Sequence, residues 1–195
     1  SAEEENAMGL VASRQVGPTV ADDIKDTAVW AVIFSLIAIF LYLLMRFNKW
    51  QYSVGAVAAT VHDTIIVLGA FSLLDGVLPF SLEVDQAFIA AILTVIGYSL
   101  NDTVVVFDRI REFFGGSTKG QMKSEVLDDA FNATLSRTFN TSFTTILVLL
   151  IIFVFGGEVL RGFIFAILLG IVVGTYSSLF IASPVLHDTS NRLGK

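Results

Sequence analysis

The sequence has 195 residues, of which 54% are hydrophobic and 15% are charged, with a formal net charge of −6 and no cysteine. An average globular domain has about 25% charged residues, and a water-soluble fold could not cover this much apolar surface, so a soluble protein is excluded. The chain has no basic face for nucleic acid, and without cysteine it can form neither disulfides nor thiolate metal sites. We therefore expect a membrane protein that binds no metal or other cofactor.

Five apolar stretches are long enough to cross a bilayer core, which takes about 20 helical residues. They are Thr27–Met45, Trp50–Leu74, Gln86–Phe107, Thr138–Gly157 and Gly162–Leu186. The residues before them, 1–26, carry six acids and are not a secretory signal peptide. We predict an all-α fold, a polytopic bundle of five transmembrane helices over residues 27–187, followed by a tail at 188–195.

The connections between these spans differ in length. Residues 46–49 form a tight turn and residues 75–85 a short acidic loop, whereas the connection 108–137 is long. Within the long connection, a set of apolar residues recurs at helical spacing: Val126, Leu127, Ala130 and Phe131. This pattern predicts an amphipathic helix lying along the membrane surface, with an ordinary surface helix that caps the bundle as the alternative.

The basic residues collect on one side of the predicted membrane domain. Nine of the 12 lie in 46–49, 108–137 and the C-terminal tail, and the other three are Arg14, Lys25 and Arg161. Cytoplasmic loops carry the excess of basic residues, so we expect the N-terminus outside and the C-terminus in the cytoplasm. Because no earlier span would carry Ser1 across, we expect this chain to be the later part of a longer polypeptide.

Two carboxylates fall inside the predicted spans. Asp63 lies midway along the second span, next to His62, and Asp102 lies six residues before Asp108. At 1.5 Å per residue, Asp102 is roughly 9 Å in from the cytoplasmic end. An ionisable side chain at this depth costs at least ~2.5–3.5 kcal/mol, so each acid is expected to face the interior, find a partner or do work.

Polar residues follow one face of the third and fourth spans. They are Thr94, Tyr98, Asn101, Asp102, Asp108, Arg109 and Glu112 on the third, and Arg137, Asn140, Thr141, Thr144 and Thr145 on the fourth. Arg137 opens the fourth span, and its long side chain could reach Asp102. Burial favours a protonated acid and a cation favours an ionised one, so Asp102 is a candidate proton carrier. Arg137 does not release its proton and would act as its partner.

Other interpretations of the acids remain open. Asp102 and Arg137 could form a structural lock between two helices, and His62, Thr60 or Thr64 could satisfy Asp63 locally. A paired-aspartate intramembrane protease is disfavoured. Such proteases have Tyr-Asp and Gly-x-Gly-Asp contexts, whereas the acids here follow His62 and Asn101. We expect no enzymatic activity.

Small residues recur at every fourth position of the last span. They are Ala166, Gly170, Gly174, Ser178 and Ala182. Such a ridge lets another helix approach closely. The partner helix is either part of the same bundle or part of another subunit.

Several strings of the sequence resemble one family. They are Val61-His62-Asp63, Ile96–Thr103, Val106–Glu112, Ser136-Arg137-Thr138, Phe155-Gly156-Gly157 and Gly170–Ser178. They resemble SecF, or the SecF half of fused SecDF proteins, from about Val16 to the C-terminus.

This resemblance implies a half-bundle similar to the resistance-nodulation-division (RND) transporters. It implies a subunit of the bacterial cytoplasmic membrane that uses proton flow to assist late protein export, with SecD, the SecYEG translocon and the secreted preprotein as partners. Asp102 matches the proton-relay acid of the family and Arg137 its associated arginine. Asp63 and His62 match a motif of less settled role. Asp63 is expected to belong to the relay, and the expected supporting residues are Asn101, His62, Tyr98 and Thr141.

The sequence departs from the family at its beginning. SecF has a first transmembrane helix and an outside domain that are not in this sequence, so residues 1–26 would be the end of that domain and a linker. We expect a fragment, a split subunit or one part of a fusion. The alternatives are a non-transporting helical adaptor and half of an RND-type lipid or drug transporter.

Overall fold

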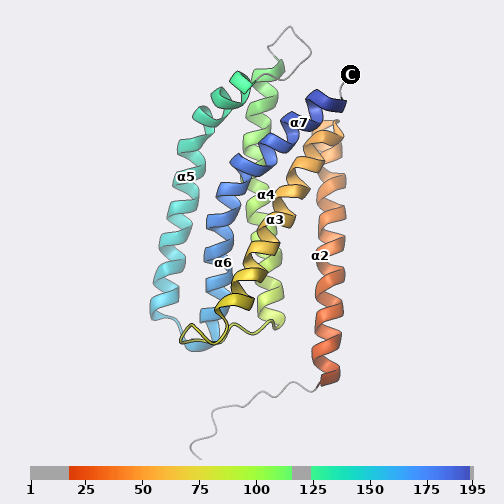
Figure 1. The fold of residues 1–195 in the computed structure, drawn as a ribbon. Coiled ribbons are helices and arrows are strands. Elements are labelled where there is room, and N and C mark those ends of the chain that lie inside the picture. Colours follow the sequence, from red (N-terminus) through yellow and green to blue (C-terminus); the bar gives the residue numbers. More distant parts are fainter. Residues whose placement is uncertain (1–17, 116–123, 194–195) are drawn as a thin grey trace, which may run out of the picture.

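The structure is a computed structural model that describes residues 18–115 and 124–193 (Figure 1). Its helices are α2 (Pro18–Phe47), α3 (Trp50–Leu74), α4 (Gln86–Gly115), α5 (Ser124–Phe155), α6 (Glu158–Ser177), the π-helical turn η1 (Ser178–Ala182) and α7 (Ser183–Leu193). Five segments of the described residues are long and apolar enough to cross a membrane: Asp26–Phe47, Trp50–Leu74, Gln86–Phe114, Leu127–Phe155 and Glu158–Arg192. The prediction of an all-α bundle with five spans is confirmed.

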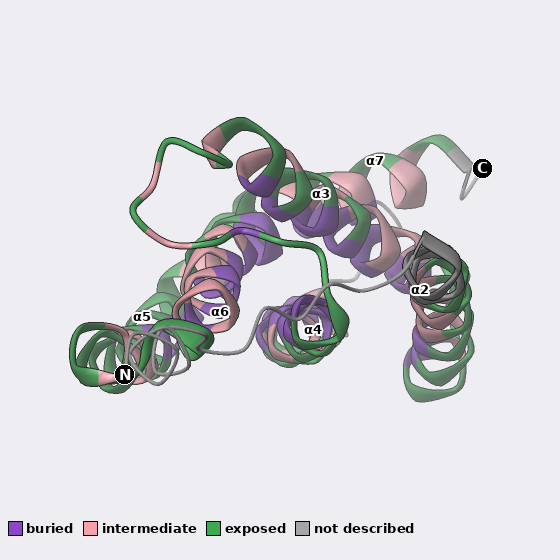
Figure 2. Ribbon diagram, turned by 90° about the horizontal axis from the view of Figure 1, so that it is seen from below, coloured by how far each residue is buried: buried purple, intermediate pink, exposed green. Residues whose placement is uncertain are grey.

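Successive membrane spans run in opposite directions, and α7 continues in the direction of α6 (Figure 1). The α2–α3 turn, the end of α4, the start of α5 and α7 lie at one end of the bundle, and the 75–85 loop and the α5–α6 turn lie at the other. Viewed along the bundle, α4, α3 and α6 present buried faces to one another, whereas α2 and α5 stand at the two sides (Figure 2). Only 6% of the apolar window of α2 and 11% of that of α5 is buried, so lipid or another chain would cover their outer faces.

A two-residue turn joins α2 to α3. Asn48 has a φ of 54°, in the left-handed region that Asn tolerates better than most residues, and its N–H donates to Leu44 O at 2.9 Å. Below this turn, the ring of Tyr52 stacks on Phe47 with centroids 4.6 Å apart and meets the edge of Phe107 at 5.3 Å. This aromatic cluster ties α2 and α3 to α4.

The long connection differs from the sequence-based expectation. Its amphipathic segment is not a separate helix but the first turns of α5, which runs unbroken from Ser124 to Phe155. Leu127 and Ala130 are buried and Phe131 is half-buried, because the apolar face continues in phase into the span and packs on the bundle. This is closer to the alternative of a helix that caps the bundle.

Helix boundaries also differ, because hydropathy marks the apolar part of a helix and not its ends. Helix α4 continues past Phe107 to Gly115, and the last span begins at Glu158 and continues through η1 into α7. Residues 1–17, 116–123 and 194–195, which include most of the expected N-terminal linker, lie outside the described residues.

The π-helical turn η1 interrupts the last span before Pro184. Proline has no N–H to give to the preceding turn, which favours a local change in helix geometry. Ser183 Oγ donates to Ser178 O, five residues earlier, at 3.2 Å. The wider turn lies against α3, where an ideal Cβ on Gly55 would be 2.7 Å from Ala182 O. Glycine at position 55 therefore permits this contact.

Candidate functional site

Asp102 is buried between three helices, with only 3% of its surface exposed. Its Oδ2 accepts one hydrogen bond, from Ser142 Oγ of α5 at 3.5 Å. This distance is well beyond the usual 2.5–3.0 Å for O–H···O bonds. Ser142 Oγ lies much closer, at 2.6 Å, to Thr175 Oγ1 of α6. Asp102 is thus a buried carboxylate with little hydrogen-bond support.

Arg137 lies near Asp102 without pairing with it directly. None of the ion pairs formed within residues 18–115 and 124–193 includes either side chain. The Arg137 side chain is exposed and borders a cavity of about 320 Å³ between α4 and α5, lined also by Val105, Asp108, Arg109, Glu112, Ala133 and Thr134. The structure therefore lacks the direct ion pair that a structural lock would require.

The other residues of the polar stripes have separate partners. Tyr98 Oη donates to Thr145 Oγ1 at 3.4 Å, which links α4 to α5 weakly. Thr141 Oγ1 donates to Arg137 O at 2.9 Å within its own helix. The Asn101 side chain is exposed and makes no hydrogen bond with the described residues. None of the four expected supporting residues forms a hydrogen bond with the Asp102 carboxylate in the described structure, and the fourth, His62, lies against Asp63 instead.

Asp63 lies in a different cluster and is itself buried, with 1% of its surface exposed. Its Oδ2 accepts hydrogen bonds from Ser99 Oγ of α4 at 2.6 Å and from Ser177 Oγ of α6 at 2.7 Å. Its Oδ1 lies 3.1 Å from Nδ1 of His62. Asp63 is therefore held by side chains from three helices.

Two of the expected local partners of Asp63 bind elsewhere. Thr60 Oγ1 donates to Ala56 O and Thr64 Oγ1 donates to Thr60 O, both at 2.9 Å. Sequence reasoning did not identify Ser99, Ser177 and Ser142 as partners of the acids, or Thr175 as the partner of Ser142. Three of these four residues lie within the family-like strings. A hydroxyl inside a span is the only signal that could have found them.

The small-residue ridge of α6 packs within the bundle. An ideal Cβ on Gly170 would lie 2.5 Å from Val95 Cγ1 and 2.9 Å from Val95 Cβ, and one on Gly174 would lie 2.9 Å from Ser99 Cβ. No larger residue fits at these positions without a shift of α6 or α4. This close approach brings Ser177 and Ser99 to the same carboxylate.

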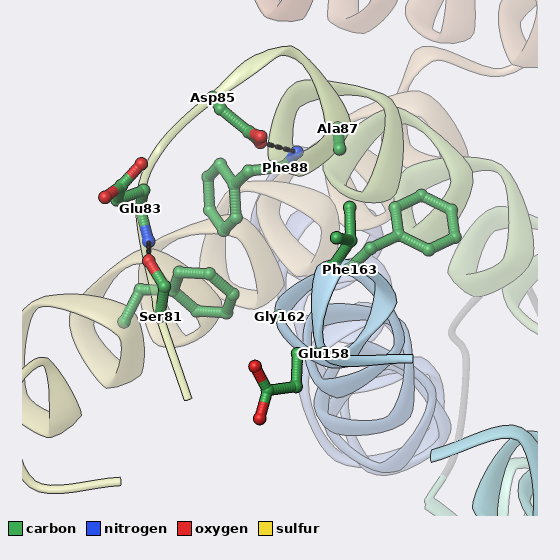
Figure 3. A pocket seen from close by; sticks show the side chains of 10 residues that line it. Ser81, Glu83, Asp85, Ala87, Phe88, Glu158, Gly162 and Phe163 are labelled. Atoms are coloured by element: carbon green, nitrogen blue, oxygen red, sulfur yellow. Dashed lines mark hydrogen bonds between the residues drawn. The ribbon is translucent and has the colours of Figure 1, made fainter. Parts of the chain in front are cut away.

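A second cavity, of about 180 Å³, lies at the opposite end of the bundle (Figure 3). The carboxylates of Glu83, Asp85 and Glu158 surround it, and Asp85 Oδ1 accepts a hydrogen bond from Phe88 N at 2.8 Å. This bond caps the start of α4. Among the residues that the structure describes, no group of three metal-ligating side chains is placed to hold a metal ion.

Known proteins resemble this chain in sequence, and a solved structure resembles it in fold. The SecF subunit of protein translocase from Rhodothermus marinus is 57% identical over 183 residues, which cover 94% of this chain and 59% of that protein. The SecF subunit of Vibrio alginolyticus is 50% identical, with 87% and 51% covered. The fused SecDF subunit of Brucella abortus is 46% identical over 88% of this chain and 22% of its own. This chain thus spans about half to three-fifths of the two SecF relatives.

A solved structure matches the whole chain. The crystal structure of SecDF in its super-membrane-facing form superimposes with a TM-score of 0.77 at 37% identity, over 100% of this chain and 27% of that one. The family model for the C-terminal part of the protein export membrane proteins SecD and SecF matches residues 2–192. The resemblance seen in the sequence is confirmed: the chain belongs to the SecD/SecF family of protein export membrane proteins.

Proposed function

We propose that this chain is the membrane part of a SecF-like subunit that couples proton flow to late protein export across the bacterial cytoplasmic membrane. Its partners would be SecD, the SecYEG translocon and the secreted preprotein. The occurrence of a fused SecDF relative supports SecD as the partner. The observation that carries the proton-coupling proposal is the contrast between the two buried acids: three side chains hold Asp63, whereas Asp102 has one long hydrogen bond.

In this proposal Asp102 binds and releases the proton. Burial disfavours a charged carboxylate and a nearby cation favours it, so the two surroundings of such an acid act against each other. Because few hydrogen bonds commit Asp102 to one state, a small change in its surroundings would suffice to load or discharge it. Arg137 would tune the charged state, and Asp63 would contribute by holding α3, α4 and α6 in place.

The proposal includes the orientation of the bundle in the membrane. At one end of the bundle lie the α2–α3 turn, the end of α4, the start of α5 and α7 (Figure 1). These segments carry Arg46, Arg111, Arg137 and Arg192. The positive-inside rule makes this end cytoplasmic. The cavity beside Arg137 would then be the proton's route to or from the cytoplasm.

The proposal is tested by Asp102→Asn in the full-length protein, in cells that depend on it for secretion. Export of a reporter is followed with and without a proton gradient. Asparagine keeps the size of the side chain and its ability to hydrogen-bond but cannot bind the proton. We expect normal assembly, loss of the gradient-dependent stimulation and unchanged gradient-independent export.

The matched control is Asp188→Asn, which changes an exposed acid of α7 in the same way. It is expected to keep full stimulation. If Asp102→Asn also keeps it, Asp102 is structural and the subunit is better described as a helical adaptor.

A further inference from the structure

Two hydroxyls connect Asp102 to the backbone of α6. Ser142 Oγ lies 3.5 Å from Asp102 Oδ2 and 2.6 Å from Thr175 Oγ1, and either hydroxyl can donate to the other. Thr175 Oγ1 is also 2.8 Å from Ile171 O. Ser142 is buried and Thr175 is half-buried, so water competes little for these bonds. The four groups form one chain from α4 through α5 to α6.

Each hydroxyl has a single hydrogen to donate, so the chain has two consistent directions. If Asp102 is protonated, it donates to Ser142, Ser142 donates to Thr175, and Thr175 donates to Ile171 O. If Asp102 is ionised, it can only accept. Ser142 then donates to Asp102, Thr175 donates to Ser142, and the bond from Thr175 to Ile171 O is lost.

The distances connect this reversal to helix position. Hydrogen bonds to a carboxylate shorten to 2.5–2.7 Å, so ionised Asp102 would draw Ser142 closer by roughly 0.8 Å. That movement pulls α5 toward α4 and strains the 2.6 Å contact with Thr175. Two residues further along α6, Ser177 is bound to Asp63 at 2.7 Å, which fixes this segment on its other side.

Few charged or titratable groups could compete with this chain. Helices α3, α5 and α6 pack against α4. Within residues 50–74, 134–155 and 162–178 of these helices, the charged or titratable side chains are Tyr52, His62, Asp63, Arg137 and Tyr176. Of these, Arg137 is exposed and borders the cavity between α4 and α5. His62 and Asp63 bind each other, and Tyr176 is exposed.

We propose that Ser142 and Thr175 are positioning residues that form a two-hydroxyl relay. The relay's direction follows the protonation state of Asp102 and transmits that state to α5 and α6. The inference rests on the proposed proton site at Asp102 but assigns residues that neither the family resemblance nor the ion-pair geometry singled out.

The test compares Thr175→Val and Ser142→Ala with Thr175→Ser in the full-length protein. Valine keeps the shape of threonine without the hydroxyl, and serine keeps the hydroxyl. We expect Thr175→Val and Ser142→Ala each to lose most gradient-dependent export, and Thr175→Ser to keep it. If the two hydroxyls act as one unit, the double variant Ser142→Ala/Thr175→Val should export as much as the single variant with the lower export. The control is Thr60→Val, a buried threonine that donates only within its own helix.

A second readout separates a relay from a passive tie between α5 and α6. Infrared difference spectra of the reconstituted full-length protein, recorded across its titration, give the carboxyl C=O band of protonated Asp102 by comparison with Asp102→Asn. If the relay exists, the Thr175→Val variant has a shifted band and unchanged gradient-independent export. An unchanged band, or equal loss of both kinds of export, overturns the relay.

The failures are distinguishable. If Asp102→Asn keeps gradient dependence, the proposed proton site is wrong. If Asp102→Asn loses gradient dependence and Thr175→Val keeps it, Asp102 is a proton site that works without the relay.

Discussion

Gly170→Leu is expected to prevent α6 from seating on α4 and to destabilise the bundle. Even the Cβ of alanine would meet Val95 Cβ at 2.9 Å, so α6 or α4 would have to move. Overpacking a filled core usually costs about 1–3 kcal/mol and occasionally more, so we expect at least about 3 kcal/mol for leucine and about 1–3 for alanine. Export should fall in proportion to the assembled protein.

The measurement is the temperature at which the full-length protein, purified in detergent, loses its monodisperse peak on size-exclusion chromatography. Gly69→Leu is the matched control, because an ideal Cβ on Gly69 meets nothing within 4 Å. It should be neutral or slightly stabilising, since glycine is the less favourable residue in a helix. Equal stability of Gly170→Leu and Gly69→Leu would show that α4 and α6 do not pack as described.

Asp63→Ala is expected to cost about 2–4 kcal/mol, because it removes the acceptor shared by Ser99 and Ser177 and leaves a cavity. Hydrogen bonds between membrane helices average only about 0.6 kcal/mol in measured cases, so the two lost bonds make up only part of this cost. Both serines can turn back to carbonyls of their own helices, which limits the loss. Detergent stability and the yield of assembled complex measure the effect.

Two variants separate the interpretations of Asp63. Asp108→Ala is the control for the same change at an exposed ion pair with Arg46, where the loss should stay below about 1 kcal/mol. Asp63→Asn keeps an oxygen acceptor for both serines and should retain assembly and gradient-dependent export. If Asp63→Asn assembles but loses the gradient dependence, Asp63 carries protons and is more than a structural anchor.

The five spans could be predicted from the sequence because a bilayer permits few alternatives to an apolar helix of about 20 residues. The ends of the helices could not be predicted in this way. Polar residues such as those of 124–137 continue a helix with the same backbone hydrogen bonds as its apolar part. Asp63 and Asp102 were found because an acid inside a span is costly.

The partners of the acids could not be found in this way. Thr60 and Ser177 are both hydroxyl residues in a span, yet one bonds within its own helix and the other reaches a carboxylate on another helix. The difference depends on the crossing and rotation of α3 against α6. These follow from close contacts such as that of Gly174 with Ser99, which involve residues far apart in the chain.

The π-helical turn has a consequence for how related chains vary in length. A π-helical turn holds one residue more than an α-helical turn, so Ser178–Ala182 can lose one residue and become α-helical without a change in the phase of the helix that follows. Leu186, now completely buried, would stay on the core side if one residue were deleted there. A single-residue gap at this point in a relative therefore does not mark a variable loop. It marks a regular last helix that keeps the same face toward α3.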